Sequence, residues 1–287
     1  MRRVGRDRHR RRETFAAVVA LALFAIAPSS ASADDAGAAQ DVGDCLGVTV
    51  AATIAGPDDG IGLRLSGEET GLRLAGIEIV DPVSARALVD GLAGRAIRYR
   101  TVGEPKPDRR RRLPALVVLD GEAERMADGA PAGRRHLMQA DILARGLGLL
   151  SGEDLPCGAI LEAAEARGRA AGAGVWGPGG MPIDAADPAL GGHVSDYVVV
   201  AGRVLSVGGG GARYYLNFGH DWATDLTITM RRDLAVRLLK SPVDDADRLV
   251  DQLDELLADH VVEARGFLRE SGGPAIDLSD ERALRVK

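Results

Sequence analysis

The sequence predicts an α+β protein with two domains, and three observations support this. The chain has 287 residues, 46% of them hydrophobic, which suits about two domains of roughly 150 residues with buried cores. Short strand-like segments alternate with segments of helical periodicity. Residues 178–195 are dense in glycine and proline, as in a linker. We therefore expect one domain over residues 46–177 and a second over residues 196–287.

Residues 1–33 have the three parts of a cleaved export signal. An arginine-rich start, an apolar run from Phe15 to Ala27 and the small residues Ala31-Ser32-Ala33 follow one another. The apolar run is shorter than the ~20 residues that span a bilayer. An uncleaved anchor and a wrongly assigned start are the alternatives. We expect an exported protein, periplasmic or extracellular, without a stable membrane span, whose mature chain begins with an N-terminal segment over residues 34–45.

Charge and cysteine content limit the partners. The net charge is −6, and loss of the basic leader makes the mature chain more acidic. Because non-specific binding to nucleic acid depends on Lys and Arg replacing counterions, we expect such binding to be weak, and an envelope protein is the other partner considered. Two cysteines cannot form a four-thiolate zinc site. In an oxidising compartment Cys45 and Cys157 are expected to form a disulfide, with two buried free thiols as the alternative.

The first domain has the pattern of strands, a helix, strands and two helices. Pro82 suits the first turn of a helix, whose apolar stripe would contain Val83, Ala87, Leu88 and Leu92. The expected strands are 48–54, 63–65, 71–77, 96–102 and 114–119, and the expected helices are 82–92, 136–147 and 159–173.

The second domain has a small barrel-like pattern with one or two inserted helices. Ser241 and Pro242 resemble an N-cap and first helical residue before a helix over residues 246–257. The strands expected are 197–207, 213–218, 226–230, 260–268 and 275–278. Its aromatic residues could stack on bases, although packing in the core and in turns is favoured; they are Tyr214, Tyr215, Phe218 and Trp222.

Common catalytic motifs are absent from the sequence. It contains no His-Glu-x-x-His, no Gly-x-Ser-x-Gly and no Gly-Lys-Ser/Thr. What remains is Arg73, Glu78, Asp81 and the run Asp108-Arg109-Arg110-Arg111-Arg112. Arginines can clamp phosphate oxygens, and a carboxylate can hold a metal or take a proton from water. Such a run is more often a solvated hairpin tip, so spacing alone is weak support for a phosphodiester site.

Four segments in order resemble one family. They are Leu72 to Asp81, Asp108 to Ala115, Leu137 to Leu147, and Glu162 to Trp176. Residues 46–177 thus resemble the staphylococcal nuclease-like (thermonuclease) family. The resemblance implies a five-stranded OB-type β-barrel with three helices. Residues 196–287 resemble the C-terminal region of bacterial thermonuclease-like proteins, which also looks like an OB-type β domain.

The resemblance also implies roles for single residues. Arg73 would clamp the phosphate, Asp81 would activate water in place of the family's glutamate, and Arg112 would stabilise the departing oxygen. Glu78 and Asp59 match positions that hold calcium, so Ca²⁺ is the cofactor expected of an active protein.

Several positions depart from the family pattern. Ile61 replaces a calcium-binding aspartate and supplies no oxygen ligand. Asp81 is one methylene shorter than glutamate, which withdraws its carboxylate by about 1 Å and can cost ~100-fold in rate. Arg111 stands where a tight-turn glycine is usual.

We therefore expect a divergent member with a degraded calcium site and little or no nuclease activity, acting as a binding or scaffolding module. The first alternative is a weakly active, metal-dependent endonuclease or phosphodiesterase that hydrolyses DNA or RNA. A second alternative is an envelope protein with unrelated chemistry.

Overall fold

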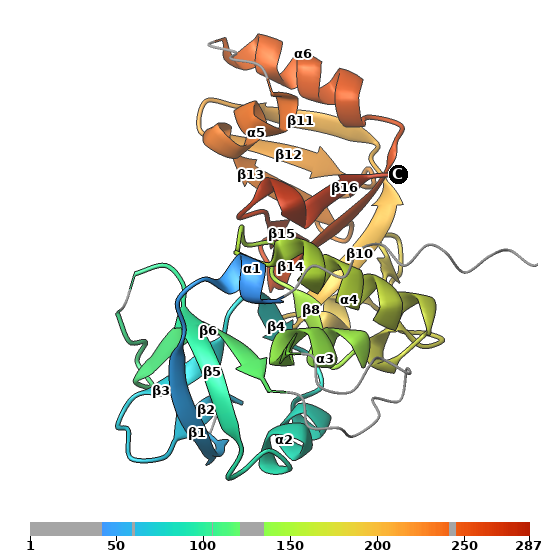
Figure 1. The fold of residues 1–287 in the computed structure, drawn as a ribbon. Helices are drawn as coiled ribbons and strands as arrows, with labels where there is room; N and C mark the ends of the chain where they lie inside the picture. Colours follow the sequence, from blue (N-terminus) through green and yellow to red (C-terminus); the bar gives the residue numbers. More distant parts are fainter. Residues whose placement is uncertain (1–41, 59–60, 105, 121–134, 241–244) are drawn as a thin grey trace, which may run out of the picture. The chain divides into compact units, whose positions relative to one another are not determined.

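A closed β-barrel forms the N-terminal half of the structure (Figure 1). The computed structural model describes residues 42–58, 61–104, 106–120, 135–240 and 245–287, all within one unit, Gln40–Lys287. The five barrel strands run in the order β3-β2-β1-β5-β6, and parallel pairing of β3 with β6 closes the barrel. These strands are β1 (Val50–Pro57), β2 (Leu63–Leu65), β3 (Gly71–Leu74), β5 (Ala96–Thr101) and β6 (Arg112–Leu119). The predicted α+β class and barrel are thus confirmed.

Alternation along the strands fills the barrel interior. Leu72 and Leu74 of β3 are buried, whereas Arg73 between them is only half-buried. Since side chains alternate between the faces of a strand, Arg73 lies on the outer face. Gln139 is fully buried and satisfies backbone groups inside the core: its Oε1 accepts from the Val117 amide at 3.2 Å, and its Nε2 donates to the Ala115 carbonyl at 2.8 Å.

Helices and a small sheet surround the barrel. α3 (Met138–Ala144) packs on α4 (Gly158–Ala170), and β4 (Ile77–Ile79) pairs with β8 (Gly148–Leu150). β7 (His136–Leu137) continues the sheet beside β6, so the helix expected over residues 136–147 is shorter than predicted. The remaining elements are α1 (Val42–Leu46), α2 (Pro82–Asp90) and the 3₁₀ turn Gly174–Trp176.

Helix α2 forms where expected but buries a different face. Ala85 and Val89 are fully buried, whereas Val83 is 79% exposed. The predicted stripe was therefore wrong at Val83 and Ala87, whereas its other two members, Leu88 and Leu92, do pack against the core. The helix packs on β1 and buries Ala85 and Val89. The small Ala85 side chain lets the helix approach closely, which outweighs the larger apolar area of the predicted stripe.

A second sheet forms the C-terminal half. Its strand order is β11-β12-β13-β15-β14-β10-β9, and β16 pairs with β14. Helices α5 (Arg232–Leu239) and α6 (Ala246–Leu257) pack over β11, β12 and β13 (Figure 1). The strands are β9 (Ile183–Asp184), β10 (Tyr197–Arg203), β11 (Ser206–Gly210), β12 (Arg213–Asn217), β13 (Thr227–Arg231), β14 (Val261–Glu270), β15 (Pro274–Asp277) and β16 (Leu284–Val286), with 3₁₀ turns Leu190–His193 and Glu281–Ala283.

Four features of this half differ from the sequence prediction. The strand expected over residues 197–207 is divided into β10 and β11. The segment expected to be a linker contains β9, which pairs in parallel with β10. Ala185 and Leu190 of the same segment are buried in the second core, so the segment is part of the domain. Helix α5 was not predicted. Residues 241–244, with the predicted cap Ser241, lie outside the described residues, and the N-cap of α6 is Asp245, which accepts from the Arg248 amide at 2.9 Å.

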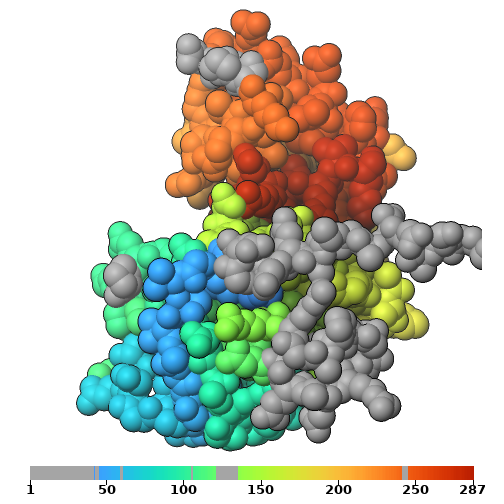
Figure 2. Space-filling model, in the orientation of Figure 1, coloured from blue at the N-terminus to red at the C-terminus, as the bar shows by residue number. Residues whose placement is uncertain are grey.

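Buried ion pairs connect α4 with β14. Arg265 Nη1 lies 2.9 Å from Glu165 Oε1, and both side chains are at most 5% exposed. Arg169 of α4 donates to both carboxylate oxygens of Glu263, at 2.8 and 2.6 Å. Figure 2 shows the red C-terminal segment directly against the yellow-green segment that contains α4. Within the described residues, no helix is long and apolar enough to cross a membrane.

Candidate functional site

The two predicted arginines lie on neighbouring strands of the barrel. Arg112 begins β6 directly opposite Gly71 of β3, two residues before Arg73. Residues two apart on a strand share a face, so Arg73 and Arg112 both project from the outer surface. The structure therefore places on one surface the two arginines that the resemblance in the sequence indicates. Arg73 makes no hydrogen bond or ion pair to any residue that the structure describes, so its guanidinium is available.

Arg112, in contrast, is engaged by two carboxylates. Its Nε donates to Asp108 Oδ2 at 2.9 Å, its Nη2 lies 2.8 Å from the same oxygen, and its Nη1 lies 3.4 Å from Asp58 Oδ2. The Arg112 side chain is only 13% exposed. A phosphate that bound this guanidinium would have to compete with carboxylates already in place.

The same cluster is packed tightly around Gly62. A Cβ added at Gly62 would lie 2.5 Å from Asp58 Oδ2 and 2.8 Å from Arg112 Cδ. The Gly62 amide donates to Asp58 Oδ1 at 2.6 Å. Asp108 also accepts from the Arg112 amide at 3.0 Å. The backbone thus fixes both carboxylates against the guanidinium.

The pKa of Asp108 is consistent with this arrangement. Partial burial opposes ionisation, but hydrogen bonds from the Arg112 side chain and from backbone amides outweigh it and lower the pKa of the carboxyl. Asp108 is therefore charged at neutral pH.

Asp81, the predicted general base, serves as the N-cap of α2. Its Oδ1 accepts from the Ser84 amide at 3.1 Å. Hydrogen bonds from Ser84 lower the pKa of the Asp81 carboxyl, which makes it a weaker base. The sequence carries a signal for this role, because Asp directly before Pro at the first helical position is a common helix start.

Glu78 occupies the middle of β4 and is half-buried. Burial raises the pKa of its carboxyl, and the positive charge of Arg73 partly opposes the rise. The other predicted metal residue, Asp59, lies outside the described residues.

The described residues do not fit a calcium site at this position. Ile61 has a hydrocarbon side chain, Asp58 is held by Arg112 and the Gly62 amide, and Asp81 caps a helix. Calcium prefers six to eight oxygen ligands. Within the described part of the chain, no group of three or more His, Cys, Asp or Glu side chains could hold a metal ion.

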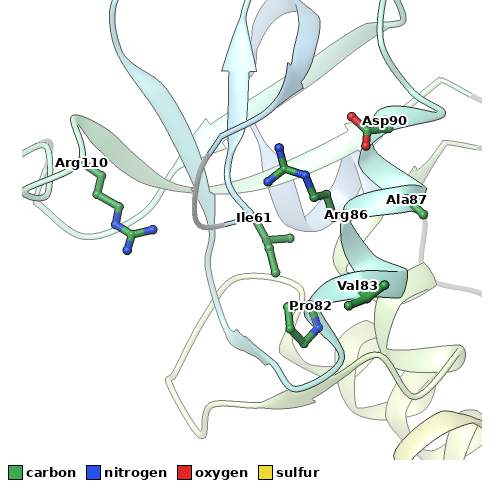
Figure 3. Close-up of a pocket in the computed structure, with 7 residues that line it drawn as sticks. All are labelled: Ile61, Pro82, Val83, Arg86, Ala87, Asp90 and Arg110. Atoms are coloured by element: carbon green, nitrogen blue, oxygen red, sulfur yellow. The ribbon is translucent and has the colours of Figure 1, made fainter.

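A surface hollow of about 560 Å³ lies near the cluster of Arg112, Asp58 and Asp108 (the arginine cluster) and is lined by Arg110 and by residues of α2. Figure 3 shows Ile61 between Arg110 on one side and Pro82, Val83 and Arg86 of α2 on the other. Ile61 adopts a positive φ of 62°, which is unusual for a β-branched residue. Its side chain thus contributes to an apolar floor at the position expected for a calcium ligand, with an arginine on either side.

Two further residues of this region were missed. Asp58 stands next to the predicted Asp59, but its partner Arg112 is 54 positions away, and no local pattern reveals that contact. Arg86 donates from Nη1 to the Asp58 carbonyl at 3.1 Å. Arg86 lies on the exposed face of α2. Helical periodicity therefore predicts only that its side chain faces solvent.

The predicted disulfide is confirmed. Cys45 of α1 is bonded to Cys157, which precedes α4, across 112 positions of sequence. The alternative of two buried free thiols is thereby excluded.

No protein-family model matches the chain, and no curated protein matches it.

Proposed function

We propose that this chain is an exported, divergent thermonuclease-like protein that acts as a binding or scaffolding module and hydrolyses phosphodiesters little or not at all. The closed barrel and the arginines on its outer face support the relationship. The observation that carries the loss of activity is the engagement of Arg112 by Asp108 and Asp58.

A transition-state stabiliser is effective when its donors are oriented toward charge that develops during the reaction. The donors of Arg112 are instead oriented toward two resident carboxylates. Breaking these charge-assisted hydrogen bonds to reach a phosphate would consume part of the binding energy that catalysis requires. Ile61 adds an apolar group where the resemblance expects a calcium ligand.

The hollow beside the cluster supports a binding role. It has an apolar floor, and its described charged lining residues are Arg86 and Arg110, which offer positive charge, and the acidic Asp90. An envelope protein with an acidic and apolar surface would complement both features, whereas the acidic charge of the whole chain disfavours strong binding to nucleic acid.

A weakly active nuclease is the second candidate, and one observation favours it. Arg73 is available on the same face as Arg112, so one phosphate clamp is retained. Asp81 and Ca²⁺ bound in another arrangement would then have to supply the remaining chemistry.

The test measures whether the protein binds a fluorescent single-stranded DNA and an RNA of equal length, and whether each strand remains uncleaved. Purified residues 34–287, the expected mature chain, are incubated with each strand in calcium and in chelator. We expect weak, salt-sensitive anisotropy changes and intact strands on a denaturing gel. Calcium-dependent cleavage that Asp81→Asn or Arg73→Ala abolishes would establish the enzyme instead.

A further inference from the structure

The exposed indole of Trp222 is the least expected surface feature of the C-terminal half. The chain has two tryptophans; Trp176 is 7% exposed and Trp222 is 71% exposed. Sequence analysis favoured core packing for the aromatics of this half, and Tyr214, with no exposed surface, agrees with that interpretation. Trp222 does not. A large aromatic ring left in water sacrifices much of its hydrophobic stabilisation, and such rings are enriched at binding sites.

The backbone holds Trp222 in place. A Cβ at Gly272 would lie 3.0 Å from Cζ3 of the indole, and one at Gly273 would lie 2.3 Å from the Trp222 carbonyl oxygen. Glycines in the β14–β15 turn therefore permit the close approach of the ring. The loop itself is closed, because the Asp221 amide donates to Asp225 Oδ2 at 2.8 Å. The ring is a pre-positioned platform, which reduces the entropy lost on binding a ligand.

A hollow of about 540 Å³ opens beside this ring. Leu205, 40% exposed, adds a second apolar surface. The polar side chains that line it are Ser206, Asn217, His220, Asp225 and Thr227. Asn217 Nδ2 donates to Ser206 Oγ at 3.2 Å, which orients the amide and leaves its carbonyl oxygen and second N–H for a ligand.

The charge of the hollow selects among ligands that stack on aromatic rings. Among the described residues that line it, none is Lys or Arg, and Asp225 is acidic. Nucleotides and other phosphate-bearing ligands would meet this carboxylate without a compensating cation. A peptide side chain would use the apolar surface but leave most of the polar rim unpaired.

We propose that this hollow is a binding site for a neutral saccharide. A pyranose ring presents C–H groups on one face, which pack on the indole, and hydroxyl groups at its edge, which both donate and accept hydrogen bonds. Asn217, Asp225 and His220 supply complementary acceptors and donors. The site lies between the start of β11 and the loop before β13, so it is independent of the arginine cluster on the barrel and of the function proposed for it.

The experiment is a calorimetric titration of residues 34–287 with three neutral tetrasaccharides: cellotetraose, maltotetraose and the β-1,4-linked tetramer of N-acetylglucosamine. We expect at least one to bind with a Kd on the order of 0.1–1 mM, as a shallow single-site hollow allows. Trp222→Ala should weaken that binding by about 10-fold or more. Phe267→Ala is the matched control, since Phe267 is an aromatic residue 50% exposed outside the hollow, and it should bind as the wild type does.

A second variant keeps the test decisive if Trp222→Ala folds poorly by circular dichroism. Asn217→Ala retains the ring and should weaken binding by roughly 5- to 10-fold through lost hydrogen bonds. The proposal is overturned if none of the three sugars binds at about 10 mM, or if both variants bind like the wild type. It is also overturned if a thymidine oligonucleotide binds in the same hollow more tightly than every sugar.

Discussion

Single residues decide the chemistry of the barrel surface. Arg73 and Arg112 stand on one face, but Asp58 and Asp108 hold Arg112, whereas Arg73 makes no hydrogen bond or ion pair to any described residue. Sequence comparison could select both arginines, since each lies in a local motif. It could not reveal the Asp58 contact, which depends on closure of the barrel between residues far apart in the chain.

Arg111 has a backbone conformation that is unfavourable for a residue with a side chain, and it lies at a position where the family that the sequence resembles usually has glycine. Its φ is 59°, in the left-handed region. We expect Arg111→Gly to raise the free energy of unfolding by roughly 0.5–1 kcal/mol, because glycine removes the side-chain strain. The lost ion pair with Glu69 is exposed on both sides and contributes little.

Urea denaturation of the wild type and Arg111→Gly measures this difference. Arg110→Gly is the matched control, since Arg110 is exposed and has no positive φ; it should be neutral or destabilising. Equal destabilisation by both substitutions would contradict the assignment of strain to position 111.

At the scale of elements, most strands could be predicted because alternation and turn residues are local signals. Helix α2 was placed correctly, but its buried face was not, since packing of Ala85 and Val89 on β1 decides the rotation of the helix. Helix α5 was missed because its eight residues make only about two turns, which is too short for helical periodicity to be distinguished from other patterns. The predicted linker contains β9, whose pairing depends on a distant partner strand.

The disulfide is the strongest single link between elements. It joins α1 to the start of α4 and closes a loop of 112 positions. In the chain-entropy model, a cross-link of this span stabilises by roughly 2–5 kcal/mol through the unfolded state. We expect the double variant Cys45→Ser/Cys157→Ser to lose about that amount and to melt at a lower temperature.

Thermal unfolding with and without reductant provides the control. Reductant should lower the melting temperature of the wild type toward that of the double variant and leave the variant unchanged. A wild-type melting temperature unaffected by complete reduction would show that the bond does not contribute to stability.

At the scale of the whole described unit, buried charges link α4 with β14. Sequence reasoning did not foresee that Glu165, Glu263 and Arg265 are at least 95% buried, because charged residues are normally placed at the surface. Their burial is tolerated because each has an oppositely charged partner.

Glu263 gives this network a pH dependence. Burial opposes its ionisation, but hydrogen bonds from Arg169 and Lys287 lower the pKa of its carboxyl from 4.5 to about 2. The folded-state pKa is depressed, so the contribution to stability is present above about pH 4.5 and is lost as the pH falls toward 2. The linked loss is on the order of 2–3 kcal/mol.

Chemical denaturation at neutral pH and near pH 2.5 tests this contribution. Glu263→Gln should destabilise by roughly 1.5–3 kcal/mol at neutral pH, because it weakens the charge-assisted hydrogen bonds from the partly exposed Arg169 and Lys287, and should show a smaller pH dependence than the wild type. Glu270→Gln, on the exposed end of the same strand, should behave like the wild type. Identical pH profiles for Glu263→Gln and the wild type would contradict the account.

We propose that the outer barrel surface that carries Arg73 and Arg112 binds a partner and does not hydrolyse phosphodiesters. The most direct measurement is the initial rate of cleavage of a fluorescent single-stranded DNA in calcium, for wild-type residues 34–287 and for Arg73→Ala side by side. We expect the wild type and Arg73→Ala to cleave at the same rate as the protein-free control, since Arg112 remains held by Asp58 and Asp108. A wild-type rate ~100-fold or more above that of Arg73→Ala, of the size expected when a preorganised transition-state donor is removed, would contradict it.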